Sequence, residues 1–165
     1  MQPRSGCPIN AAVEVLGDRW TLLVLRDVIF DDRRYFRALL TGSAEGIASN
    51  ILADRIKRLL DGGLLARGGT AVRGQRARFS LTEAGIQTVP ILCALGEWGL
   101  DRRPGDPALR ARQQLIRDEG PAFVHELMDE LRALHLDAPP RARAGPSPLE
   151  RLHAAQAAAS GEPSP

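Results

Sequence analysis

The chain has 165 residues, which suits one domain with some extension, and 44% of them are hydrophobic and 25% charged. No apolar run approaches the roughly 20 residues needed to span a bilayer, the N-terminal stretch lacks the apolar core of a signal peptide, and the two cysteines are too few for a disulfide framework. We therefore expect a cytoplasmic protein with reduced thiols, no membrane partner and no cofactor.

The charges are segregated along the chain, although the net charge is only +2. Residues 44–80 hold seven basic and three acidic side chains, whereas residues 106–138 hold four basic and seven acidic ones. Lys57 is the only lysine among 22 cations, and arginine favours bidentate partners such as phosphate. A GC-rich genome would produce the same arginine-rich composition, so the composition alone does not indicate a partner. The clustering of the basic residues in the middle of the chain is what indicates a polyanionic partner.

The chain opens with two predicted helices. Apolar spacing predicts a helix over 9–16 that ends at Gly17. Asp18 is a good N-cap for the next helix, over 19–30, whose almost wholly apolar surface predicts a central, buried position. A short helix over 35–40 comes after a charged turn.

The stretch "SNILADRIKRL" predicts an amphipathic helix over 48–61, which Gly62 and Gly63 should end. Its apolar face comprises Leu52, Ile56, Leu59 and Leu60. Its opposite face comprises Asn50, Ala53, Asp54 and Lys57. A surface helix needs only solubility on its outer face, so the function of this face depends on the next element of the chain.

A change to two-residue alternation predicts a hairpin after this helix, with strands in 64–67 and 76–81 joined by a glycine-bearing loop. We expect one face to carry Ala77, Phe79 and Leu81. The other face should carry Arg76, Arg78 and Ser80.

Helices are also predicted in the second half of the chain. Thr82 should cap a helix over 83–100 that Pro90 kinks. Two helices then flank Gly120-Pro121. The chain after Asp137 is rich in Pro, Ala, Gly and Ser, which predicts disorder. Within this segment, residues 149–159 could form a weak helix. The expected divisions are a domain at 7–101, a helical extension at 107–137 and a disordered tail at 138–165.

A basic hairpin directly after three helices is the plan of a winged helix-turn-helix, so the predicted fold is mainly α with a small β-hairpin. Several motifs support this in consecutive order: "CPINAAVEVLGDRWT", "RYFRALL", "GIASNILADRIKRLLDGGLLAR", "RARFSLTEAG" and "PILCALGEWG". Together they resemble HxlR-type regulators, a branch close to the MarR family, over about residues 7–100. The departures are Gly74-Gln75, where the family's wing often has two prolines, and the helices of 107–137, which have no counterpart.

The resemblance implies a transcription regulator, not an enzyme, that pairs through the first and last helices of the core as a homodimer. It would bind double-stranded DNA at a pseudo-palindromic operator. The expected DNA-binding residues are Arg34, Ala48, Ser49, Asn50, Ala53, Asp54, Arg55, Lys57, Arg73, Arg76 and Arg78. The sequence reveals neither the operator, the effector nor the sign of regulation.

Several of these residues have a second interpretation. Ser49 would serve equally as an N-cap, and Asp54 would either accept a hydrogen bond from cytosine or pair with a neighbouring cation. Arg55 lies on the flank of the helix, where it would reach a phosphate or hold the helix to its neighbours. The arginines of the hairpin would also suit a solvated edge.

Two other functions are consistent with the sequence. Cys7 precedes a helix start, which lowers a thiol pKa, and it would therefore suit a sensor of oxidants; the alternative is a packed, inert residue. The acidic 107–137 segment would suit a protein-interaction module. The three histidines lie outside the resemblance and form no metal motif. A small-molecule or oxidant effector is a further partner that such a regulator would accept.

Overall fold

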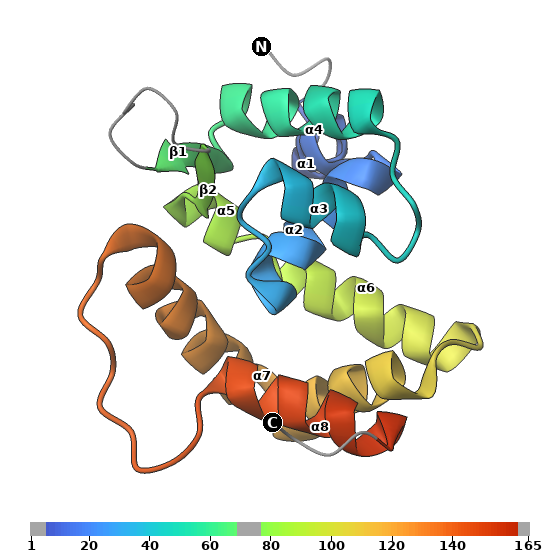
Figure 1. Ribbon diagram of the computed structural model, residues 1–165, viewed down its shortest axis with the longest axis vertical. Coiled ribbons are helices and arrows are strands. Elements are labelled where there is room, and N and C mark those ends of the chain that lie inside the picture. The colour runs from blue at the N-terminus through green and yellow to red at the C-terminus, as the bar shows by residue number, and fades with distance from the viewer. Residues whose placement is uncertain (1–5, 69–76, 162–165) are drawn as a thin grey trace. The chain divides into compact units, whose positions relative to one another are not determined.

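The computed structural model describes residues 6–68 and 77–161. The chain divides into two compact units, Met1–Gly85 and Ile86–Pro165. The first contains the helices and hairpin of the predicted winged helix, and the second contains the later helices (Figure 1).

The first unit begins with four helices, α1 (Pro8–Leu16), α2 (Arg19–Asp31), α3 (Phe36–Gly42) and α4 (Ser49–Asp61). Asp18 caps α2 as predicted, because its Oδ1 accepts the backbone N–H groups of Trp20 and Thr21, each at 3.0 Å. Leu25, Val28 and Ile29 are fully buried, which confirms α2 as the central helix.

The apolar face of α4 packs on α2 and α3, and Leu52, Ile56 and Leu59 are at most 4% exposed. Gly63 comes after the helix with a φ of 69°, a left-handed conformation that suits glycine. The predicted amphipathic helix and its glycine stop are therefore confirmed, and the polar face of α4 remains outside.

The strands β1 (Leu65–Gly68) and β2 (Arg78–Leu81) pair antiparallel, with Leu65 opposite Leu81. Phe79 and Leu81 are buried as expected, but Ser80 is also buried, although alternation placed it on the outer face. The chain before α3 explains this, because the buried Arg34 donates to the Ser80 hydroxyl and Tyr35 forms a bridge with Arg78. The end of β2, over Phe79–Leu81, is thus buried on both faces, whereas Arg78 at its start is exposed.

A break replaces the kink that we expected at Pro90. The residues form a short helix, α5 (Glu83–Ile86), and a separate helix, α6 (Val89–Arg102). Pro90 lies in the first turn of α6, where a missing N–H costs no helical hydrogen bond.

The second unit packs α7 (Pro107–Leu136) against α6 and against α8 (Pro148–Ser160). Gly120, with φ 72° and ψ −161°, interrupts α7 at the predicted boundary between two helices. The structured residues of α8 correct the expectation of disorder, since Leu149 and Leu152 are buried in the unit. Ser147 and Glu150 form a capping box, a local signal that the proline- and alanine-rich composition obscured.

Candidate nucleic-acid interface

The outer face of α4 is open to solvent in its first two turns. Ser49, Asn50 and Ala53 are exposed, and the N-cap is Ala48, whose methyl side chain cannot cap. Ser49 is therefore the first helical residue and does not take the N-cap role that we considered for it. The first turn of α4 has no side-chain cap, so backbone N–H groups and small side chains meet the solvent there.

Asp54 pairs locally. Its Oδ2 lies 3.0 Å from Nε of Arg58, one turn further along, and 2.5 Å from Nη1 of Arg55. A carboxylate that would repel a phosphate is thus balanced by two cations within α4. Of the two interpretations that the sequence left open, the structure shows the local pair.

Arg55 fastens α4 to the start of α2. Its Nε lies 2.7 Å from Oδ1 of Asp18, and its side chain is only 17% exposed. Burial of Asp18 opposes ionisation, but hydrogen bonds from Thr21 and the charge of Arg55 outweigh it and hold the pKa of Asp18 below its ordinary value. Of the two interpretations that the sequence left open for Arg55, the structure shows the one in which it holds α4 to its neighbours, and its contact with phosphate stays a prediction.

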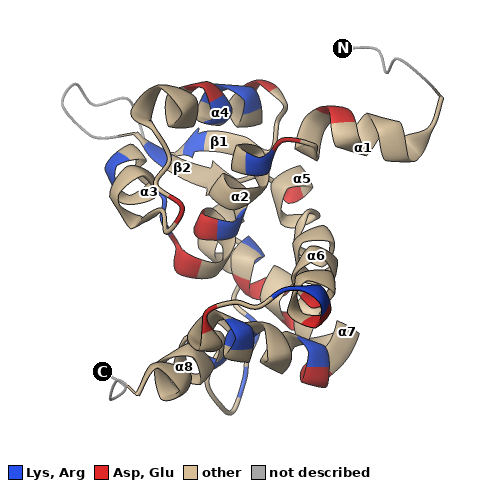
Figure 2. Cartoon of the chain, turned by 90° about the vertical axis from the view of Figure 1, so that its right-hand side faces the viewer, with Lys and Arg blue, Asp and Glu red and all other residues tan. Residues whose placement is uncertain are grey.

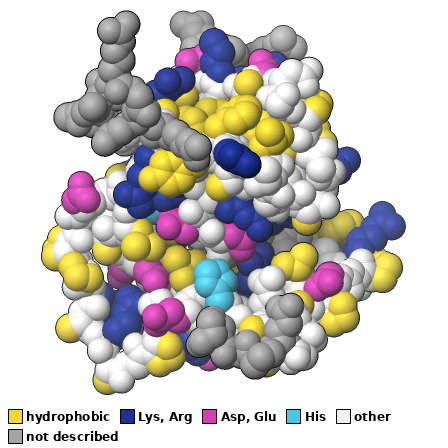
Figure 3. All heavy atoms as spheres, viewed as in Figure 1, with side chains coloured by type: hydrophobic (Ala, Val, Ile, Leu, Met, Phe, Trp, Pro, Cys, Tyr) yellow, Lys and Arg dark blue, Asp and Glu magenta, His cyan; other side chains and the backbone are white. Residues whose placement is uncertain are grey.

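Lys57 is the most exposed cation of this face, with 75% of its side chain accessible. Its Nζ lies 2.6 Å from Oδ2 of Asp61, and this hydrogen bond raises the pKa of Lys57, so the amine stays charged. An ion pair this exposed contributes little and exchanges readily for another anion. Figure 3 shows basic and acidic side chains next to each other along the upper edge, where α4 lies in Figure 1.

The hairpin adds further cations. Arg78 is exposed at the start of β2 and Arg67 is exposed on β1, both on the strands that carry basic segments in Figure 2. Arg73 and Arg76 lie outside the described residues, so their predicted DNA contacts remain predictions.

Arg34 is a structural residue, which corrects its predicted role as a phosphate contact. Only 3% of its surface is exposed. Its Nε donates to the carbonyl of Phe79 at 2.9 Å, and its Nη2 donates to the Ser80 hydroxyl. Because β2 lies more than forty residues further along the chain, no local pattern in the sequence revealed this contact.

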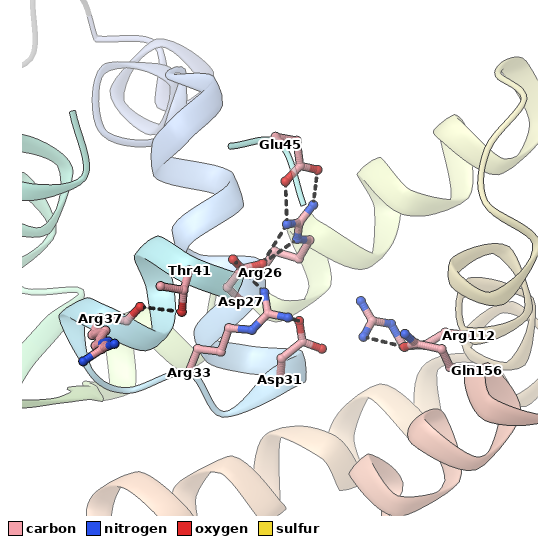
Figure 4. Close-up of polar contacts among 9 residues, drawn as sticks. All are labelled: Arg26, Asp27, Asp31, Arg33, Arg37, Thr41, Glu45, Arg112 and Gln156. Atoms are coloured by element: carbon pink, nitrogen blue, oxygen red, sulfur yellow. Dashed lines mark hydrogen bonds and ion pairs between the residues drawn. The ribbon is translucent and has the colours of Figure 1, made fainter. Parts of the chain in front are cut away.

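A second arginine cluster supports the turn that leads into α4 (Figure 4). Arg26 of α2 pairs with Glu45, and its Nη1 lies 2.6 Å from Oε1 of that residue. Nη2 of Arg26 lies 2.7 Å from Oδ1 of Asp27. Arg33 pairs with the other oxygen of Asp27, with its Nη1 3.1 Å from Oδ2. Burial raises the pKa of Asp27, although both arginines favour its charged form. Sequence reasoning missed this cluster, because Arg26 and Glu45 belong to different predicted elements.

The two cysteines have opposite environments. Cys7 is exposed and occupies the N-cap position of α1, as the sequence predicted, and its sensing role stays a prediction. Cys93 is buried in α6, and burial raises the pKa of its thiol to about 11, so the thiol stays protonated.

Within the described residues, no group of three or more histidine, cysteine or carboxylate side chains is placed to hold a metal ion. Over the same residues, no helix is both long and apolar enough to cross a membrane.

Comparison with known proteins identifies the family. The profile of the family described as HxlR-like helix-turn-helix matches residues 15–105, more than half of the chain. The chain belongs to the HxlR-like helix-turn-helix family. This confirms the resemblance noted in the sequence, and the relatives of the chain are named as transcriptional regulators, not as enzymes.

Relatives in distant organisms agree with this membership. An uncharacterised HTH-type transcriptional regulator of Mycobacterium tuberculosis (strain ATCC 25618 / H37Rv) is 32% identical over 109 residues, which cover 65% of this chain and 67% of that protein. Another, from Synechocystis, is 30% identical over 95 residues, which cover 58% of this chain and 69% of that protein.

Solved structures support the winged-helix fold. The crystal structure of PA1607, described as a candidate transcription factor, has a TM-score of 0.55 at 29% identity, and the match covers 62% of this chain and 69% of that one. A candidate MarR-family regulator from Porphyromonas gingivalis W83 has a TM-score of 0.51 at 24% identity over 62% of this chain and 98% of that one. The second likeness is one of fold alone, and it confirms the predicted mainly helical winged helix-turn-helix.

Proposed function

We propose that this HxlR-like regulator binds double-stranded DNA as a homodimer, with α4 in the major groove and the hairpin beside the neighbouring backbone. The observation that carries the proposal is the outer face of α4, which is exposed, lies directly before a basic hairpin and is held in place by the Arg55–Asp18 pair. A helix of this kind fits the major groove with its first residues toward the base edges.

The roles within α4 divide by exposure. Asn50 can bond an adenine edge bidentately, while Ser49 can donate to a base or a phosphate. Ala48 and Ala53 are small and exposed, which lets the backbone approach the groove closely. Lys57 exchanges its pair with Asp61 for a phosphate.

We further propose that α1 and α6 form the dimer. Each presents apolar side chains to solvent in the single chain: Ile9 is 74% and Val13 57% exposed on α1, while Leu95 is 48% and Trp98 58% exposed on α6. Exposed apolar patches of this kind mark interaction surfaces. Two copies related by a twofold axis would present two α4 helices to the half-sites of a pseudo-palindromic operator.

The test measures binding of the full chain to fluorescent DNA from its own promoter region between 50 and 200 mM salt. Log affinity should fall linearly with log salt, because each neutralised phosphate releases counterions. Lys57→Gln and Arg78→Gln should each weaken binding to all sequences and reduce the salt slope by about 1. Arg141→Gln, an exposed cation of the second unit, is the matched control and should leave the slope unchanged.

No binding at the lowest salt, or binding independent of salt, contradicts the proposal. If both Gln variants bind DNA as the unchanged chain does, α4 and the hairpin are not the interface. The alternative of a protein-interaction module that acts through the acidic 107–137 segment would then be favoured.

A further inference from the structure

The turn that leads into α4 is tied to α2 by a bidentate ion pair (Figure 4). Nη1 of Arg26 donates to Oε1 of Glu45 at 2.6 Å, and its Nη2 donates to Oε2 at 2.8 Å. The hydrogen bond from Arg26 is the main cause that lowers the pKa of Glu45, so this carboxylate is charged at neutral pH. Two parallel hydrogen bonds fix the direction of the contact as well as its length.

The guanidinium of Arg26 is itself held in place on α2. Its Nε donates to Oδ1 of Asp27 at 2.9 Å, and Nη1 of Arg33 lies 3.1 Å from the other oxygen of the same carboxylate. Asp27 is only 3% exposed, so it is fixed in the folded body of the first unit. Arg26 therefore meets Glu45 from a position that is already set.

The region of α4 is thus tied to α2 at two places, in addition to its apolar packing. Arg55 of α4 pairs with Asp18 at the start of α2, and Glu45, just before α4, pairs with Arg26 further along α2. Asp18 and Arg26 are roughly two helical turns apart, or about 12 Å along the axis. A single tie would let α4 pivot about it, whereas two ties at this separation also fix the direction of the helix axis.

A short connection joins Glu45 to the residues that we expect to face the bases. Gly46 turns the chain with a φ of 67°, Ile47 is only 6% exposed, and α4 begins at Ser49. The connection is short and anchored in the core, so a shift of the Glu45 carboxylate moves the first turn of α4, where Ser49 and Asn50 are exposed.

We propose that Arg26 and Glu45 are positioning residues that determine the sequence specificity of DNA binding. They would hold the first turn of α4 at the depth and angle that hydrogen bonds to base edges require. Contacts between exposed cations and phosphates carry no sequence information and tolerate small shifts of α4, so they should survive loss of the pair. This inference rests on the proposed DNA binding and adds the residues that make it selective.

Glu45→Gln in the full chain separates this role from simple electrostatics. The variant removes a negative charge, so electrostatics alone predicts equal or tighter binding of every DNA. The unchanged chain first selects its preferred sequence from a pool of random DNA duplexes. We expect the variant to bind this sequence about tenfold more weakly, the effect of one lost base contact, and to bind a shuffled duplex of the same composition no more weakly than before. Fluorescence anisotropy measures both affinities.

Asp118→Asn is the matched control, because it removes one negative charge from an exposed position of the second unit. It should leave the preference for the selected sequence unchanged.

Arg26→Lys provides a second variant, since lysine keeps the charge but cannot form the bidentate contact. It should lose the preference for the selected sequence to a similar extent. The double variant with Glu45→Gln should lose no more than either single variant, because the two residues act as one pair. Circular dichroism checks folding, and if Arg26→Lys does not fold, the comparison of Glu45→Gln with Asp118→Asn decides.

The outcomes distinguish this inference from the proposed function. If the unchanged chain enriches no sequence from the pool, specific DNA binding is contradicted and this inference fails with it. If it enriches one and Glu45→Gln keeps the full preference, this inference alone is overturned. Equal losses on the selected and the shuffled DNA also overturn it, because a merely structural pair would lower the fraction of binding-competent chain whatever the sequence.

Discussion

Asp18 has two structural roles, since its carboxylate caps α2 and pairs with Arg55 of α4. The same oxygen, Oδ1, serves both contacts. The side chain that starts the central helix therefore also sets the position of the proposed reading helix. Any change in its charge should alter stability and the placement of α4 together.

Asp18→Asn should separate the two roles, because asparagine still caps a helix but carries no charge. We expect a loss of about 0.5–1 kcal/mol at pH 7, since the pair is partly exposed. The folded pKa of Asp18 lies below the ordinary value of 3.8, so its contribution is present above that value and is lost as the pH falls toward the folded pKa. Urea unfolding of both proteins checks this: their difference in free energy should shrink below pH 3.8. A difference that stays constant as the pH falls through this range would contradict it.

Arg34 and Arg78 are close in the fold but differ in exposure. We therefore expect Arg34 to contribute to the stability of the fold and Arg78 to contribute to DNA binding. Arg34→Ala should cost about 2–4 kcal/mol of unfolding free energy, because it leaves the carbonyl of Phe79 without its buried donor. Arg78→Ala, at an exposed position, should change stability by no more than about 0.5 kcal/mol. Thermal unfolding measures both, and equal losses would show that Arg34 does not stabilise the hairpin as a buried donor.

At the scale of elements, α8 shows how a few buried leucines stabilise a helix in a segment rich in proline and alanine. Leu152 is fully buried, and the backbone N–H of Leu149 donates to Oε2 of Glu130 at 3.0 Å. Arg151 pairs with Glu119 and its guanidinium lies 5.0 Å from the ring centroid of Phe123. Contacts with both halves of α7 thus hold α8.

Leu152→Ala should loosen this helix, with a cost of about 2–5 kcal/mol for a truncated core leucine. Hydrogen exchange provides the measurement. In the Leu152→Ala variant, the exchange of the α8 amides should speed up more than that of the α4 amides. His153→Ala changes the exposed neighbour and serves as the control. Equal protection in the two variants would mean that Leu152 does not anchor α8.

Periodicity predicted the elements whose identity depends on local pattern. The face of α4, the strands of the hairpin and the interruption at Gly120 result from the spacing of apolar residues and from glycine and proline chemistry. The pairing of Arg34 with β2 and of Arg26 with Glu45 could not be predicted, because each joins segments whose distance in space the sequence does not encode locally. For the same reason, the sequence could not reveal that Arg34, which was predicted to contact phosphate, is buried.

At the scale of the whole molecule, each unit carries exposed apolar side chains, and we propose that those of α6 take part in dimerisation. Leu95→Glu on α6 should convert a dimer into a monomer, because it places a charge in an apolar contact without disturbing the core of the chain. Light scattering after size exclusion measures the mass, and DNA affinity should fall with it. Leu109→Glu, at a similarly exposed position of α7, is the control and should remain dimeric.

The composition of the chain gives α4 a chemical property that the other helices lack. Lys57 is the only lysine, and its side chain is 75% exposed on the proposed reading face. An amine-reactive reagent therefore meets one side-chain target in the chain besides the α-amine at the N-terminus. Footprinting with such a reagent, with the α-amine as internal reference, would report occupancy of α4 by DNA at a single atom.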